Sequence, residues 1–186
     1  LILAVLALII SAIVWALGAN SSNPHLAGRG KTGVLVALGA AIITGGDSGI
    51  GRAVAIAYAR EGADVALSYL DETEDAQSTA QLIRDAGREC LTFAGDISDP
   101  EHCRSIVAET AQKFGRIDIL VNNAAHQETF HTIEEIPDEE WQYTFATNIH
   151  AMFYLTKAAV PHMKPGSAII NTASINADDP SPNLLA

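Results

Sequence analysis

Hydrophobic and polar segments alternate regularly along the chain from about residue 34 onward. Short apolar runs predict five strands, at Ala40–Thr44, Asp64–Leu70, Cys90–Ala94, Ile117–Val121 and Ser167–Thr172. Longer segments predict four helices between them, at Gly51–Glu61, Thr73–Ala86, Ser98–Phe114 and Asp138–Val160. A glycine directly follows each of the first three helices, at a position where helices commonly end. Ser98 and Glu101 have the spacing of a capping box, which predicts that Ser98 caps the third helix.

This repeated strand–helix order predicts an α/β fold. The strands are expected to form a doubly wound parallel sheet with helices on both faces. Short apolar strands without strict alternation agree with burial on both faces. Right-handed crossovers give the strand order 3-2-1-4-5. Ligands of such sheets bind at the carboxyl ends of the strands, so functional residues are expected there.

The first 38 residues differ from the rest of the chain. Residues 1–19 are apolar except for Ser11, and residues 20–38 have the composition of a linker. An uncharged run of this length is about what a helix needs to cross a bilayer, and Arg29 and Lys31 after it would keep the rest of the chain in the cytoplasm. Two alternatives stay open: a cleaved signal peptide ending near Gly18, and a fragment or misassigned reading frame.

Composition and charge narrow the function. The chain has 186 residues, of which 48% are hydrophobic and 18% charged, so it has enough apolar residues for one globular domain and is not a disordered protein. This domain is expected at residues 39–186. The net charge of −11 argues against nucleic acid as a partner. Cys90 and Cys103 form neither a disulfide framework nor a zinc motif, and the six histidines have no metal-binding spacing, so no metal site is expected.

A glycine-rich segment, TGGDSGIG, joins the first predicted strand to the first helix. Its candidate cofactor-binding residues are Thr44, Gly45, Asp47, Ser48, Gly49, Ile50 and Gly51. Glycines let the backbone turn sharply and approach a pyrophosphate, while the helix N-terminus supplies free N–H groups for its charge. A tight strand–helix turn without a ligand is the alternative.

Further candidate residues follow the third and fourth strands. Asp96 is placed to accept a hydrogen bond from an adenine amino group and Ile97 to pack on the ring, unless Asp96 only caps the next turn. After the fourth strand, Asn123 can tie strand ends together, and Ala124 and Ala125 leave room for a nicotinamide ribose. A plain turn is the alternative for these three residues.

Four more features carry alternatives of their own. Asn148 lies inside a predicted helix, where Asn has a poor propensity, so it is either functional or solvent-facing. Ser174 follows the fifth strand and is placed to bond a substrate carbonyl, unless it is a turn serine. His126 is interpreted as a surface residue, with a place in a substrate pocket as the alternative. The acidic segment 134–140 is interpreted as a solvated helix start.

Together these motifs resemble the short-chain dehydrogenase/reductase family, classical type. TGGDSGIG, Asp96, NNAA, Asn148 and Ser174 have the order and spacing of that family. GRIDILVNNAA and PGSAIINTAS are similar to its bacterial glucose-dehydrogenase-like, general-stress branch. The resemblance covers residues 39–186 and implies a Rossmann fold. It also implies an NAD(P)-dependent, homo-oligomeric oxidoreductase that transfers a hydride between the nicotinamide cofactor and a small alcohol or carbonyl substrate.

The resemblance assigns catalytic roles to two residues of this chain. Ser174 would polarise the substrate oxygen, and Asn148 would keep a water in the proton relay. The family's general acid/base Tyr follows the Ser by about thirteen residues, with a Lys about four residues later, and both positions fall after Ala186. The sequence therefore resembles the front part of such an enzyme.

Three expectations and two alternatives follow. The 186-residue chain is expected to turn over substrate poorly, to have an open edge at its fifth strand, and to expose an apolar face on its long helix. A catalytically inactive nucleotide-binding or dimerising protein is one alternative to a cytoplasmic enzyme. The other is an enzyme tethered to a membrane through residues 1–19.

The cofactor subtype is read near the end of the second strand, about 20 residues after the glycines. The strand ends in Ser68-Tyr69-Leu70-Asp71, with no Arg for a 2′-phosphate, and Asp71 lies slightly late for a ribose hydroxyl. Asp64 has the spacing but begins the strand. These residues favour NAD and leave NADP open.

Overall fold

The computed structural model of the protein describes residues 39–174 and 178–179. The hydrophobic segment 1–19 and the linker 20–38 therefore lie outside the described residues, as do residues 175–177 and 180–186. Among the helices that are described, none is long and apolar enough to span a bilayer.

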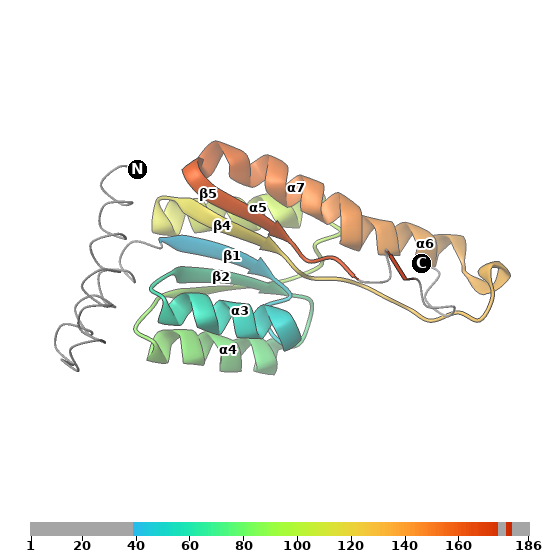
Figure 1. Ribbon diagram of the computed structural model, residues 1–186, viewed down its shortest axis with the longest axis horizontal. Helices are drawn as coiled ribbons and strands as arrows, with labels where there is room; N and C mark the ends of the chain where they lie inside the picture. The colour runs from blue at the N-terminus through green and yellow to red at the C-terminus, as the bar shows by residue number, and fades with distance from the viewer. Residues whose placement is uncertain (1–38, 175–177, 180–186) are drawn as a thin grey trace.

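Five parallel strands form one sheet in the order β3-β2-β1-β4-β5, which confirms the predicted doubly wound Rossmann fold (Figure 1). The elements are, in chain order, β1 (Ala40–Thr44), α3 (Gly49–Arg60), β2 (Asp64–Tyr69), α4 (Thr73–Asp85), β3 (Cys90–Ala94), α5 (Pro100–Phe114), β4 (Ile117–Asn122), η1 (Ile133–Glu135), α6 (Asp138–Phe145), η2 (Ala146–His150), α7 (Ala151–Ala159), η3 (Val160–His162) and β5 (Met163–Asn171). η1 and η3 are 3₁₀ turns, whereas η2 is a π-helical segment.

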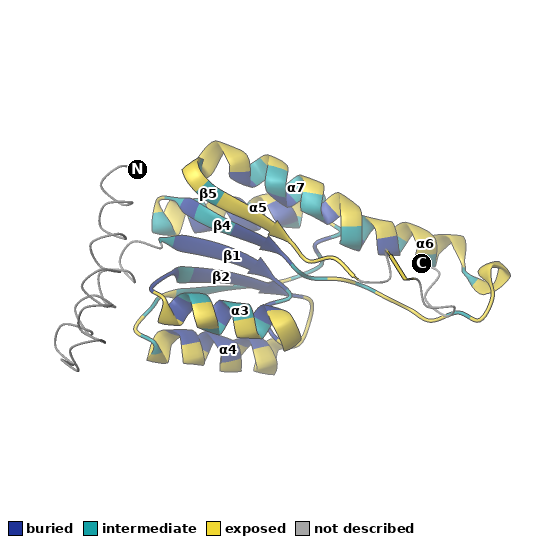
Figure 2. Ribbon diagram, viewed as in Figure 1, coloured by how far each residue is buried: buried dark blue, intermediate teal, exposed yellow. Residues whose placement is uncertain are grey.

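Helices cover both faces of the central strands, and the strands are the most deeply buried part of the molecule (Figure 2). Ala41 and Ile43 of β1 pack with residues of α3 and α4, whereas Ile42 between them packs with residues of α5 and α7. Side chains alternate across a strand, so this division gives the sheet two hydrophobic layers. On α3, Gly51, Ala55 and Ala59 recur every four residues and form its buried face. Their small size lets α3 lie close to the sheet.

The segment 138–160 is not the single regular α-helix that the sequence predicts. α6 ends at Phe145, residues Ala146–His150 of η2 take π-helical geometry, and α7 continues from Ala151. Asn148 lies inside the π segment. Such segments often occur at functional sites because they reorient the side chains of one helical turn.

The predicted capping box of the third helix is wrong. Asp99 is the N-cap of α5, and its Oδ1 accepts a hydrogen bond from the N–H of Glu101 at 2.9 Å. The N–H of Ser98 donates to Oδ1 of Asp96 at 2.8 Å, so Ser98 belongs to the turn before the helix. Pro100 at the first helical position needs no N–H partner, which fits the later start.

β5 is the edge strand of the sheet and is longer than predicted. It begins at Met163 rather than Ser167, because Met163 pairs with Ile117 before a shift in register. Ile169 and Ile170 point to opposite faces and are 38% and 42% exposed. Within residues 39–174, the expectation of an open edge at the fifth strand is confirmed.

Candidate functional site

The turn between β1 and α3 requires glycine at particular positions. A Cβ on Gly51 would lie 1.9 Å from the carbonyl oxygen of Gly45, so any side chain there would push the turn apart. Gly49 begins α3 with a φ of +52°, and no atom lies within 4 Å of where its Cβ would be. The backbone is therefore open at Gly49, where the first N–H groups of α3 have no partner within the helix.

A polar network ties together the carboxyl ends of β1, β4 and β5. Oγ1 of Thr44 accepts hydrogen bonds from the N–H groups of Asn123 and Ala124, both at 2.9 Å. The Asn123 side chain donates to the Thr44 carbonyl at 3.1 Å and accepts from Oγ1 of Thr172 at 3.3 Å. Asn122 donates to Asn171 at 2.8 Å. These bonds fix the positions of the loops that follow the three strands.

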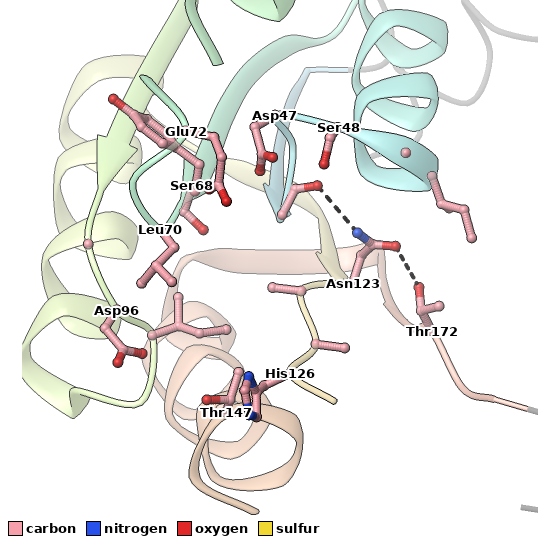
Figure 3. Close-up of a pocket in the computed structure, with 18 of the residues that line it drawn as sticks. Asp47, Ser48, Ser68, Leu70, Glu72, Asp96, Asn123, His126, Thr147 and Thr172 are labelled. Carbon is pink, nitrogen blue, oxygen red and sulfur yellow. Dashed lines mark hydrogen bonds between the residues drawn. The ribbon is translucent and has the colours of Figure 1, made fainter. Parts of the chain in front are cut away.

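A pocket of about 630 Å³ lies over these strand ends, beside the glycine turn (Figure 3). It is lined by ten of the twelve predicted cofactor-binding residues: Gly45, Asp47, Ser48, Gly49, Ile50, Asp96, Ile97, Asn123, Ala124 and Ala125. The other two, Thr44 and Gly51, do not line it, because both are buried in the packing of the turn. The two predicted catalytic residues, Asn148 and Ser174, also lie outside the lining. Ser174 is an exposed residue after β5.

Asp96 and Ile97 lie at one side of the pocket, after β3. Oδ1 of Asp96 accepts the bond from the Ser98 N–H, so this carboxylate caps a turn and lines the pocket at once. Ile97 is only 7% exposed, and its carbonyl accepts a hydrogen bond from Sγ of Cys103 at 3.0 Å. Burial, and then the charge of Asp96, raises the pKa of Tyr143, which also lines the pocket.

His126 is part of the pocket, and its interpretation as a surface residue is wrong. Its side chain is 25% exposed, and Nε2 lies 2.7 Å from Oε1 of Glu140. The imidazole meets the Tyr143 ring edge-on, with 4.7 Å between ring centroids. Glu140 is 18% exposed and also accepts from Oγ1 of Thr144 at 3.1 Å. This last acid of the 134–140 segment is therefore not solvated as predicted, since it supports the pocket wall.

Asn148 is not solvent-facing in the way its alternative interpretation assumed. Its Oδ1 accepts from the N–H of His126, and its Nδ2 donates to the His126 carbonyl, both at 2.8 Å. The π segment thus holds the loop after β4. Asn148 acts on the pocket wall through this backbone.

The lining also contains residues that the sequence did not single out as ligand contacts: Ser68, Tyr69, Leu70, Glu72, Gly95, Tyr143, Thr147 and Thr172. Six of them end or directly follow β2, β3 and β5, in agreement with the rule for strand ends, which was the available signal. Tyr143 and Thr147 are one helical turn apart, and the sequence contained no signal for that face. Residues 39–174 and 178–179 hold no cluster of three or more His, Cys, Asp or Glu side chains placed to bind a metal.

Comparison with known proteins gives this geometry a family. The model of the family described as short chain dehydrogenase matches residues 39–186. The chain belongs to this family. A second model, for a family of unknown function (DUF6112), matches residues 1–65.

Individual members of the short-chain dehydrogenase family support the assignment. General stress protein 39 of Bacillus subtilis (strain 168) is 51% identical over 145 residues, which are 78% of this chain and 51% of that protein. A short-chain dehydrogenase from Burkholderia cenocepacia J2315, solved in complex with NADP, has a TM-score of 0.75 and 33% identity, over 78% of this chain and 59% of that one. L-Sorbose reductase from Gluconobacter frateurii, complexed with NADPH and L-sorbose, has a TM-score of 0.74 and 35% identity, over 79% and 56%. The chain spans about half the length of the curated relatives it matches.

Proposed function

We propose that this chain carries the cofactor-binding part of an NAD(P)-dependent oxidoreductase that transfers a hydride between a nicotinamide cofactor and a small alcohol or carbonyl compound. The observation that carries the proposal is the pocket over the strand ends, which adjoins both the open glycine turn and the His126–Tyr143 wall. Its volume of about 630 Å³ is within the usual range for ligand sites.

The residues present fit a dinucleotide. The open backbone at Gly49 and the free N–H groups of α3 suit a pyrophosphate, which carries negative charge. Asp96 and Ile97 supply an acceptor and an apolar surface for adenine. On the other side of the turn, Asn123 and Ala124 are fixed by the Thr44 network and would hold the nicotinamide ribose. A small ligand would occupy only one of these two regions, whereas a dinucleotide would contact both the adenine side and the nicotinamide side.

The chemistry that a bound nicotinamide supplies is hydride transfer. The part of the protein is to hold the substrate and move a proton to or from its oxygen. We assign Ser174 to the substrate oxygen, as the family resemblance implies. We assign Asn148 a positioning role, because its side chain is already bonded to the His126 backbone. The relay water that the resemblance implies would then bind to other groups of the π segment, since the polar atoms of the Asn148 side chain are already bonded to His126.

The relatives support the substrate class. NADP and NADPH are bound in the two solved relatives, and one of them also holds L-sorbose, a carbonyl sugar. We propose residues 39–186 as the dinucleotide-binding unit, residues 20–38 as a linker and residues 1–19 as a separate hydrophobic segment. A cytoplasmic location and the NAD(P) dependence of the whole protein stay predictions.

Titration of the 186-residue chain with reduced dinucleotides tests the proposal. NADH and NADPH fluoresce, and binding in a partly apolar pocket changes the intensity. We expect saturable binding of at least one of them, with displacement by ADP-ribose but not by ribose 5-phosphate. If neither dinucleotide saturates a correctly folded chain, as judged by circular dichroism, the proposed function is wrong.

A second proposal concerns self-association. Four large apolar side chains, Trp141, Phe145, Ile149 and Phe153, recur every four residues along α6, η2 and α7 and are 47%, 38%, 55% and 60% exposed. Such a stripe favours pairing with a second copy of the chain. Sedimentation velocity over a range of concentrations should show a dimer or larger species. The Phe153→Glu variant should shift the sample toward monomer, and a monomeric wild type at all concentrations would contradict the proposal.

A further inference from the structure

One end of the pocket is bounded by Asp47, Ser68 and Glu72, which lie near one another on the turn after β1, the end of β2 and the start of α4 (Figure 3). Tyr69, the last residue of β2, is 6% exposed and occupies the place where an acid is expected in NAD-binding sheets. The two carboxylates at this end of the pocket come from other positions: Asp47 from the turn after β1, and Glu72 from the loop between β2 and α4.

Asp47 is a buried acid held by its backbone. It is 7% exposed, its carbonyl accepts a hydrogen bond from Oγ1 of Thr79 at 3.1 Å, and the neighbouring Gly46 N–H donates to the Ser68 carbonyl at 3.0 Å. The structure gives the Asp47 carboxylate no hydrogen-bond donor from residues 39–174. A carboxylate that is mostly shielded from water and lines a pocket is stabilised by donors on a ligand.

Glu72 adds a second negative charge at the rim of this end. Its Oε2 accepts from the N–H of Asp71 at 3.3 Å. Hydrogen bonds from its own backbone N–H and from that of Asp71 hold the pKa of Glu72 below its usual value. The carboxylate is therefore charged at neutral pH.

No cation balances these charges within the pocket lining, which contains neither Lys nor Arg. Arg52 on α3 is turned toward α4, where its Nη2 donates to Oγ of Ser78 at 3.3 Å. A 2′-phosphate is recognised by Arg or Lys, whereas a ribose diol is recognised by a carboxylate that accepts its hydroxyl protons.

We infer that Asp47 and Glu72 select NAD(H) over NADP(H) at this site. The inference rests on the proposed function and deepens it. The 2′- and 3′-hydroxyls of an unmodified ribose can donate hydrogen bonds to the carboxylates of Asp47 and Glu72. A 2′-phosphate brings about two further negative charges, offers no donor when fully ionised, and meets two carboxylates of like sign. The two NADP-bound relatives, at 33% and 35% identity, and an NADPH-dependent aldehyde reductase of Arabidopsis thaliana, at 46% identity, use the other cofactor, so the inference sets this chain apart from them.

The test compares equilibrium binding of NADH and NADPH to the 186-residue chain, by fluorescence at low ionic strength. We expect NADH to bind at least about tenfold tighter. Raising the salt concentration should narrow the ratio, because ions screen the rim charge. Glu72→Arg should tighten NADPH binding by about tenfold, because it adds a cation for the 2′-phosphate, and should weaken NADH binding, because it removes an acceptor for the ribose hydroxyls. Glu74→Arg, an exposed acid two residues away and outside the pocket, is the matched control and should leave the ratio unchanged.

The outcomes separate the inference from the proposal beneath it. Binding of both dinucleotides with equal affinity, or tighter binding of NADPH, overturns the selection by Asp47 and Glu72 and leaves the proposed function standing. Equal effects of the Glu72 and Glu74 variants also overturn it, because they would show only an effect of net charge. Failure of both NADH and NADPH to bind refutes the proposed function itself, and the inference with it.

Discussion

Asn148 bridges the backbone N–H and carbonyl of His126, accepting one hydrogen bond and donating the other, each at 2.8 Å. The two residues are 22 positions apart and belong to the π segment η2 and to the loop after β4. A side-chain amide offers a donor and an acceptor side by side, which a hydroxyl or a carboxylate does not match. This explains an Asn inside a helix, where its propensity is poor.

Removing this bridge should destabilise the protein. Asn148→Ala leaves two backbone groups of the loop without their partners, and we expect a loss of about 2 kcal/mol in the free energy of unfolding. Asn148→Asp keeps only the hydrogen-bond acceptor, so its free energy of unfolding should lie between those of the wild type and Asn148→Ala. Urea denaturation measures both. Gln142→Ala, at an exposed position of α6, should change stability by less than about 0.5 kcal/mol, and equal effects at 142 and 148 would argue against the bridge.

Gly49 should matter for ligand binding beyond its backbone conformation. Gly49 and Gly87 both have positive φ, +52° and +78°, and both have open space where a Cβ would be. Each substitution by Ala should cost about 1 kcal/mol in stability. Only Gly49→Ala places a methyl group in the pocket, so it alone should weaken NADH binding, by about tenfold or more. Similar binding by the two variants would mean that the pyrophosphate does not approach this turn.

Stability should fall in alkaline solution through Cys103. Burial raises the pKa of this thiol to about 12 from an ordinary value of 9.0, and the side chain is fully buried. Between these two values the unfolded thiol is ionised and the native thiol is not. The native state then binds more protons, so the free energy of unfolding decreases as pH rises above about 9.

Cys103→Ser isolates this contribution, since other groups also titrate above pH 9. The difference between wild type and variant should change with pH by up to about 1.4 kcal/mol per pH unit over that window, and should be constant below pH 8. Urea denaturation in the presence of a reductant gives both curves. Parallel curves from pH 7 to pH 11 would show that the buried thiol does not contribute.

Glu140 should stabilise the pocket wall, whereas its neighbour Glu139 should not. Glu140 contacts His126 at 2.7 Å and accepts from Thr144, while Glu139 is exposed. We expect Glu140→Ala to lower the free energy of unfolding by about 1–2 kcal/mol and Glu139→Ala to change it by less than about 0.5 kcal/mol. Thermal or urea unfolding of the pair decides the point, and indistinguishable variants would remove Glu140 from this role.

The fold could be predicted because its determinants are local. The apolar runs of β1 and β3 end at a glycine turn and at Gly95, so both strands have the predicted boundaries. Three helices begin and end within two residues of the prediction, since a glycine lies just after the end of each of them. The strand order follows from the handedness of parallel crossovers.

The candidate site was less predictable where it depends on contacts between distant segments. No sequence pattern shows that Asn148 would meet the backbone of His126, so neither the π segment nor the burial of that histidine could be inferred. The contact of His126 with Glu140 has the same character. By contrast, the residues directly after β1, β3 and β4 could be placed in the pocket, because the sheet brings those ends together.

The central place of β1 sets an order in which the chain can be assembled. β1 can pair with β2 soon after both have been synthesised, but its other side waits for β4, and Asn123 reaches Thr44 across 79 residues. Contacts over such separations form slowly. A nascent chain that has not yet released residues 117–122 from the ribosome therefore exposes an unpaired central strand, a state open to capture by chaperones or by other unfinished chains.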